Sequence, residues 1–184
     1  MGRSLIGRPP ADEHWNPKMT ISLHAVSAGV FVRMLTNLDA ILAKAEANAA
    51  ERKFNPDVFV TSRLAPDMNP FSFQIQAATD RSKLFVARVT GQAAPVWEDN
   101  EKTFAEVRAR LGKGLDYHKG IQAAQLDGLE DKMIPLKIRG EDVQWSALDY
   151  LNKNAMPNFY FHVTTAYDIL RHAGVPVGKR DFTG

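Results

Sequence analysis

The sequence lacks cysteine, and this absence removes several classes of chemistry at once. None of the 184 residues is a cysteine. Disulfide bonds, thiolate nucleophiles and cysteine-ligated zinc or iron–sulfur centres are therefore excluded. A chain without cysteine also fits a cytoplasmic location, and we expect the protein there.

The sequence has no excess of charge of one sign and no long hydrophobic run. It contains 23 basic and 21 acidic residues, for a formal net charge of +2. The basic residues are scattered along the chain and never form a run of five or more. No apolar run reaches the ~20 residues of a membrane span. We therefore predict neither nucleic acid nor a membrane as a partner.

The glycine-containing motifs of nucleotide-binding and hydrolytic enzymes are also missing. There is no P-loop, no dinucleotide-binding glycine pattern and no nucleophile elbow. The nearest glycine pair, Gly112 and Gly114, lies inside a helical pattern and is too sparse to hold a phosphate. The sequence thus indicates no cofactor and identifies no reaction, so whether the protein is an enzyme stays open.

Helical periodicity dominates what is present. The length suits one domain with a real core, and we predict a tail over residues 1–20 and a single domain over 21–184. Apolar residues recur at helical spacing in four long segments. These predicted helices cover residues 22–52, 70–89, 102–121 and 146–174, and a short helix is predicted over 56–59.

One segment changes to a period of two. Ile134, Leu136 and Ile138 alternate with polar or turn-forming residues, and a turn is predicted over residues 139–142. This pattern predicts a β-hairpin. Ser146 and Asp149 then form a capping pattern that opens the last helix. The sequence therefore predicts a mainly α fold, a four-helix bundle with a small β-hairpin before the last helix.

The last predicted helix carries a histidine inside its apolar stripe. His162 could act as a general base or orient a ligand in a pocket between helices, or it could be a neutral core histidine. We name Gln74, Asp67 and Tyr167 as companions in such a pocket. Each also has a structural interpretation: a boundary residue for Gln74, a helix cap or a partner of Arg63 for Asp67, and a core aromatic for Tyr167.

A metal site is not expected. Neither E-x-x-H nor H-x-x-x-H occurs in the predicted helices. His162 and His172 are ten residues apart, which separates their backbones by about 15 Å on a continuous helix. A metal would need His162 together with ligands from other helices, such as His24 or His118.

Three blocks of sequence resemble a known family. They cover residues 64–68, 148–151 and 157–179. Together they resemble a domain-of-unknown-function family within the DinB/YfiT-like superfamily of proposed metalloenzymes, over roughly Met19 to Gly184. The resemblance implies an up-down-down-up four-helix bundle that is often dimeric. It also implies a site of three histidines in the metal-binding members, one on the second helix and an H-x-x-x-H pair on the last.

The chain departs from that metal site. The second helix offers Gln74 or Gln76 in place of the histidine, and residues 158 and 166 are asparagine and alanine. The resemblance therefore implies a degenerate metal site around His162.

Two hypotheses of function remain. The first is a protein, expected to be a homodimer, that binds a small-molecule ligand in an inter-helix pocket around His162. The second is a non-catalytic dimeric scaffold or interaction protein. A cavity with converging polar groups favours the first, and a sealed, hydrogen-bonded His162 favours the second.

Overall fold

The computed structural model describes residues 21–184, which form a mainly helical fold with one small antiparallel hairpin. The predicted tail over residues 1–20 lies outside the described residues. The helical elements are α1 (Leu23–Val26), α2 (Ala28–Glu51), η1 (Pro56–Phe59), α3 (Phe71–Thr90), α4 (Phe104–Lys119), η2 (Ala123–Gln125), α5 (Ala147–Tyr150), η3 (Leu151–Ala155), α6 (Met156–His172) and α7 (Lys179–Thr183). The strands are β1 (Met133–Ile138) and β2 (Glu141–Ser146). The predicted mainly helical fold with a hairpin before the last long helix is confirmed.

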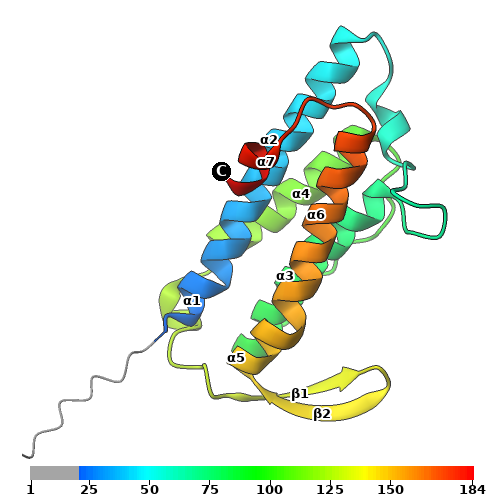
Figure 1. Cartoon of the computed structure of the whole chain (residues 1–184). Helices are drawn as coiled ribbons and strands as arrows, with labels where there is room; N and C mark the ends of the chain where they lie inside the picture. The colour runs from blue at the N-terminus through cyan, green and yellow to red at the C-terminus, as the bar shows by residue number, and fades with distance from the viewer. Residues whose placement is uncertain (1–20) are drawn as a thin grey trace, which may run out of the picture.

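The four longest helices lie side by side, and the hairpin closes one end of them (Figure 1). Helix α3 packs against both α6 and α4, while α2 packs against α4. Helices α2 and α6 run away from the hairpin end, and α3 and α4 run towards it (Figure 1). The largest fully buried apolar side chains come from all four helices: Phe31, Leu35, Phe71, Ile75, Phe85, Phe104 and Phe159.

The first predicted helix is interrupted near its start. Ser27 separates α1 from α2 with φ −123° and ψ −85°, and its hydroxyl donates to the Leu23 carbonyl. The whole segment Leu23–Glu51 is long and apolar enough to cross a membrane by length and composition alone. Its apolar side chains, however, are those packed inside the molecule. This burial fits a core helix.

Gly114 lets α4 approach α3 closely. A Cβ atom on Gly114 would lie 2.6 Å from Cγ2 of Thr79, far inside van der Waals contact. The second glycine of the sequence pair, Gly112, has open space around it. Of this pair, Gly114 therefore serves helix packing.

The hairpin matches its prediction except in the length of its turn. The loop consists of Arg139 and Gly140 alone, with φ of 53° and 90°, and Glu141 already belongs to β2. Two positive φ values in a two-residue loop are typical of a type I′ hairpin. Ser146 then caps α5, because its hydroxyl accepts from the Asp149 amide at 3.1 Å. The predicted capping pattern is confirmed.

A π-helical turn leads into the last long helix. The chain passes from α5 through η3 to α6, and Pro157 stands in the first turn of α6. Proline lacks the N–H that a regular α-helix needs, and a π-helical turn is one of the ways a helix accommodates that loss. The helix thus changes its pitch just before Pro157.

Candidate functional site

His162 lies between α3 and α6, where it is hydrogen-bonded to Gln74. Its Nδ1 lies 2.8 Å from Oε1 of Gln74. The Gln74 side chain is 2% exposed, and its Nε2 donates to the carbonyl of Asn69 at 2.9 Å. The structure therefore brings together the two residues that the sequence named first, and a backbone carbonyl holds the glutamine amide in place.

The surroundings of His162 keep its imidazole neutral. Burial, and secondarily the nearby positive charge of Arg81, lower the pKa of His162 from 6.5 to about 4. Phe73 and Phe161 stand edge-on to the ring, with centroids at 5.9 Å and 5.3 Å. At neutral pH the ring thus has one nitrogen that donates and one that accepts.

Asp67 and Tyr167 lie apart from this pair. Asp67 is exposed in the loop before α3, and Arg63 donates to the Met68 carbonyl. Pro70, not Asp67, occupies the N-cap of α3. Tyr167 packs on Phe182 of α7, with ring centroids 5.8 Å apart. Within residues 21–184 no hydrogen bond joins either side chain to His162.

The other histidines named for a metal each have their own surroundings. His24 Nε2 lies 3.0 Å from the carbonyl of Ile121. His118 is 1% exposed, and its ring lies 5.0 Å from that of Phe31. Among residues 21–184 no group of three His, Asp or Glu side chains could hold a metal ion. Among the described residues His162 therefore belongs to no set of three such ligands.

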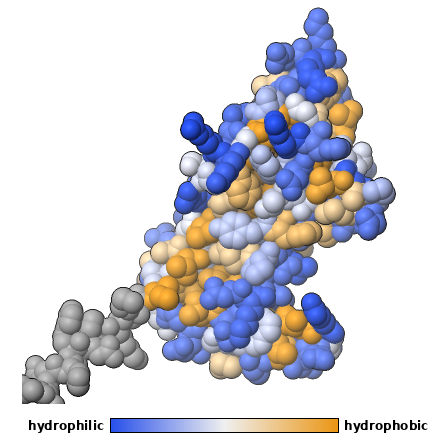
Figure 2. Space-filling model, in the orientation of Figure 1, coloured by the Kyte–Doolittle hydropathy of each residue, from blue (hydrophilic) through white to orange (hydrophobic). Residues whose placement is uncertain are grey.

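A basic pocket opens beside the His162 pair, and sequence reasoning missed it. It is a cavity of about 590 Å³ between α3, the hairpin and the start of α6. It is lined by five cationic residues, Arg81, Arg88, Lys137, Arg139 and Lys153, and by Ile138, Trp145, Asn154 and Asn158. Among the described residues, no carboxylate lines it. In Figure 2 the surface is indented between the hairpin at the bottom and the helices above, and hydrophilic side chains border the indentation.

Most of these cations lack an acidic partner. Of the five pocket cations, only Lys153 forms a salt bridge within residues 21–184, and its partner Asp149 lies at 2.9 Å. Arg88 donates to the hydroxyl of Tyr150 at 2.7 Å. Arg81, Lys137 and Arg139 make no side-chain hydrogen bond to the described residues. Their positive charge is therefore directed to the pocket and to solvent.

The pocket adjoins His162 without including it. Asn158 lines the pocket and lies one helical turn before His162 on α6. Arg81 lines the pocket and also lowers the pKa of His162. One sequence signal pointed this way: Arg81 and Arg88 are seven residues apart on a helix, a spacing that puts both on one face.

Comparisons with known proteins agree with the fold. Residues 23–183 match the family model described as a domain of unknown function (DUF1993). The crystal structure of a DinB family member protein from Shewanella denitrificans is similar at 41% sequence identity and a TM-score of 0.81. That match covers 88% of this chain and 92% of the other. No curated protein sequence matches. The chain therefore belongs to the DUF1993 family and has a DinB-like fold.

Proposed function

We propose that this member of the DUF1993 family binds a small anionic molecule in the basic pocket beside His162. One observation carries the proposal: five cationic side chains from α3, the hairpin and η3 line one cavity, and no carboxylate of residues 21–184 lines it. Like charges held together repel one another. A bound anion relieves that repulsion and gives the cations hydrogen-bond partners.

The chemistry of the lining suits such a ligand. Guanidinium groups bind carboxylate and phosphate oxygens in a two-pronged geometry. Asn154 and Asn158 add amide groups, and Trp145 adds a flat apolar surface. The volume of about 590 Å³ falls within the range of ~300–1,000 Å³ that small-molecule sites occupy. The pocket thus combines charge, hydrogen-bonding groups and an apolar wall.

Inorganic phosphate and pyrophosphate are the probes for this function, with sodium chloride at matched ionic strength as the reference. A ligand that binds the folded state raises the melting temperature by mass action. We expect both anions to do so beyond the effect of chloride. We expect Arg81→Gln to weaken the shift, because it removes one of the unpaired pocket cations. Equal shifts with chloride and the phosphates would overturn the proposal.

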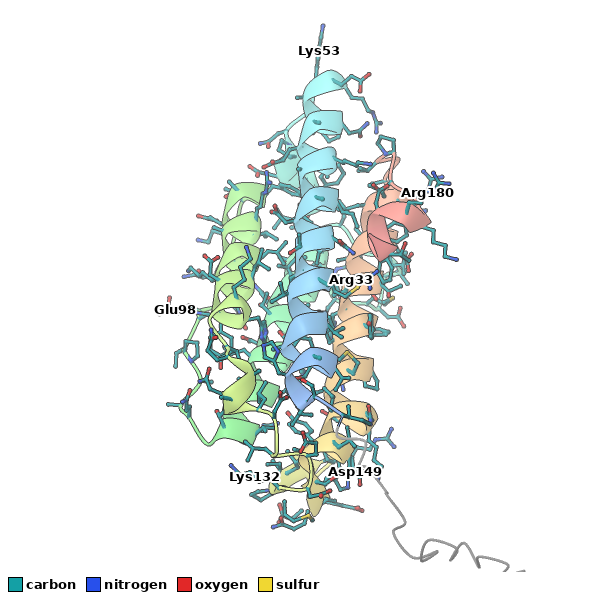
Figure 3. All side chains as sticks on the ribbon, turned by 90° about the vertical axis from the view of Figure 1, so that its left-hand side faces the viewer. Arg33, Lys53, Glu98, Lys132, Asp149 and Arg180 are labelled. Atoms are coloured by element: carbon teal, nitrogen blue, oxygen red, sulfur yellow. The ribbon has the colours of Figure 1, made fainter. Side chains whose placement is uncertain are left out.

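The matched control is Lys53→Gln. Lys53 is exposed at the end of α2, and Figure 3 places it at the opposite end of the molecule from Asp149. The Lys53→Gln variant loses one positive charge, as Arg81→Gln does, but leaves the pocket intact. An equal loss of the phosphate effect in both variants would assign that effect to net charge alone.

The second candidate function is a homodimeric scaffold, which exposed aromatic side chains on α3 and α6 support. Phe73 is 37% exposed, Tyr160 37% and Phe161 55%. Apolar side chains gathered at a surface are typical of interfaces. A dimer through this face would cover His162. Sedimentation of the wild type against Phe161→Ser tests it: a monomeric wild type would rule it out.

A further inference from the structure

We propose that Nε2 of His162 is the hydrogen-bond acceptor for a hydroxyl group of the ligand, and that Asn69 and Gln74 set this role by fixing the tautomer of the ring. This inference rests on the proposed function and names the ligand class: a small organic anion that carries a hydroxyl group.

The tautomer follows from a chain of hydrogen bonds with one direction. The Asn69 carbonyl can only accept, so the side-chain atom of Gln74 that faces it is the amide nitrogen. That leaves Oε1 of Gln74 facing the ring of His162, at 2.8 Å from Nδ1. Since Oε1 can only accept, Nδ1 must carry the proton. A neutral ring with its proton on Nδ1 presents a bare lone pair at Nε2.

That lone pair has no protein partner and is not sealed. No hydrogen bond to Nε2 is made within residues 21–184, and His162 is 9% exposed. The fully buried side-chain nitrogens without a partner in this part of the chain are both on His118, so Nε2 of His162 is not among them. The neighbouring rings of Phe73 and Phe161 are themselves exposed. An approaching ligand can therefore reach Nε2.

The distance to the basic pocket limits the size of the ligand. Asn158 lines the pocket, and four residues of α-helix separate it from His162, a rise of about 6 Å. A molecule with its anionic group among the pocket cations and a hydroxyl a few bonds away spans that gap. Phosphorylated and carboxylated alcohols share this chemistry. The tests below distinguish the two.

The first test concerns the tautomer and needs no ligand. The ¹⁵N chemical shifts of histidine ring nitrogens separate a protonated nitrogen from a bare one. We expect Nδ1 of His162 to be protonated and Nε2 bare at neutral pH. In Gln74→Leu, which lacks the acceptor for Nδ1, we expect the Nε2-protonated form to become populated. A wild-type ring with its proton on Nε2 would overturn the inference.

The second test compares ligands that differ in hydroxyl groups. Glycerol 3-phosphate is paired with propyl phosphate, and glycerate with propionate, in calorimetric titrations. A neutral hydrogen bond corresponds to about a threefold to tenfold preference for the hydroxylated member. The pair that shows it identifies the anionic group. Equal affinities within both pairs would overturn the inference while leaving the pocket intact. No binding of any of the four would overturn the proposed function, and the inference with it.

His162→Asn is the variant for this test. The asparagine amide can take the place of Nδ1 opposite Gln74, but it has no atom at the position of Nε2. We expect it to bind propyl phosphate as the wild type does and to lose the preference for glycerol 3-phosphate. A retained preference in this variant would contradict the role of Nε2. His162→Gln offers an amide near the position of Nε2, and we expect it to recover part of the preference.

Discussion

Helix α3 has two polar sides, and they differ in whether their arginine side chains have acidic partners. On the side of α4, Arg110 is 1% exposed and donates to Thr79, Asp80, Asp99 and Glu101. On the side of α6, Arg81 has no such partner within residues 21–184. The first arrangement satisfies its cation completely, whereas the second leaves a cation available.

The tryptophans follow the same division. Trp97 is half-buried between Lys83 and Arg110, which lie 4.2 Å and 5.1 Å from its ring centre. Trp145 lines the basic pocket, and the exposed Lys153 lies over its ring at 5.7 Å. A cluster whose cations have acidic partners fixes the loop over residues 92–103. A cluster without them leaves room for a ligand.

The two buried histidines differ in the same sense. His118, on the α4 side, has no partner for either ring nitrogen among the described residues and is sealed by aromatic neighbours. His162, on the α6 side, gives Nδ1 to Gln74 and keeps Nε2 accessible. His118 is therefore closed to any ligand, whereas His162 keeps one accessible hydrogen-bonding nitrogen near a cavity and is a candidate for binding.

Among the variants that test this comparison, we expect Arg110→Met to change the free energy of unfolding most. The substitution leaves the Glu101 carboxylate without its buried cation, while Asp80 keeps Lys83, and breaking a buried ion pair on one side destabilises a protein by about 3–5 kcal/mol. Urea denaturation of the wild type and the variant measures the free energy of unfolding. Arg81→Met is the control, and we expect a change within about 0.5 kcal/mol for an exposed side chain. Equal losses in the two variants would show that both sides of α3 are structural.

His118 predicts a loss of stability in acid. Burial lowers its pKa from 6.5 to about 3 in the folded protein. Between these two pH values His118 is therefore protonated in the unfolded chain and neutral in the folded protein. The contribution of His118 to the free energy of unfolding is therefore fully present above the unfolded pKa of 6.5 and decreases as the pH falls towards about 3. At about pH 4 the loss is on the order of 3 kcal/mol, since each unit of pKa corresponds to about 1.4 kcal/mol.

His118→Leu separates this loss from that of other titrating groups. The variant keeps the lowered-pKa carboxylates of Glu106, Asp127 and Asp181, which also favour folding above their pKa values. Denaturation at about pH 7 and about pH 4 gives the acid loss in each protein. We expect the loss to be smaller in His118→Leu than in the wild type. Identical losses would mean that folding does not lower the pKa of His118.

Local patterns in the sequence predicted the helices and the hairpin because each depends on residues close in the chain. The Ser146–Asp149 cap and the alternation of Ile134 and Leu136 are such signals. The break at Ser27 was not predicted, because the apolar period continues through it. Gln74 and His162 are 88 residues apart, and only their positions on apolar faces suggested that they meet.

The basic pocket could not be predicted in the same way. Its cations come from α3, the hairpin and η3, and each segment carries only one or two of them, so no run of basic residues appears. The pairing of α3 with α6 and the position of the hairpin bring them together (Figure 1). Tyr167 shows the converse. It is close to His162 in sequence, yet it packs on Phe182 of α7.

The smallest expected effect concerns Arg81. Its substitution and that of Lys83 should change the free energy of unfolding in opposite directions on the two sides of α3. Without a ligand, Arg81 lies among like charges, so Arg81→Gln should raise the free energy of unfolding by a few tenths of a kcal/mol at low salt, and added salt should remove the gain. Lys83→Met, on the α4 side, loses a bond of 2.6 Å to Asp80 and should lower stability at every salt concentration. Urea denaturation of both variants at low and high sodium chloride measures the signs. A loss of more than about 1 kcal/mol in Arg81→Gln would mean that this arginine has a structural partner, and the pocket would then lack the free cation on which binding depends.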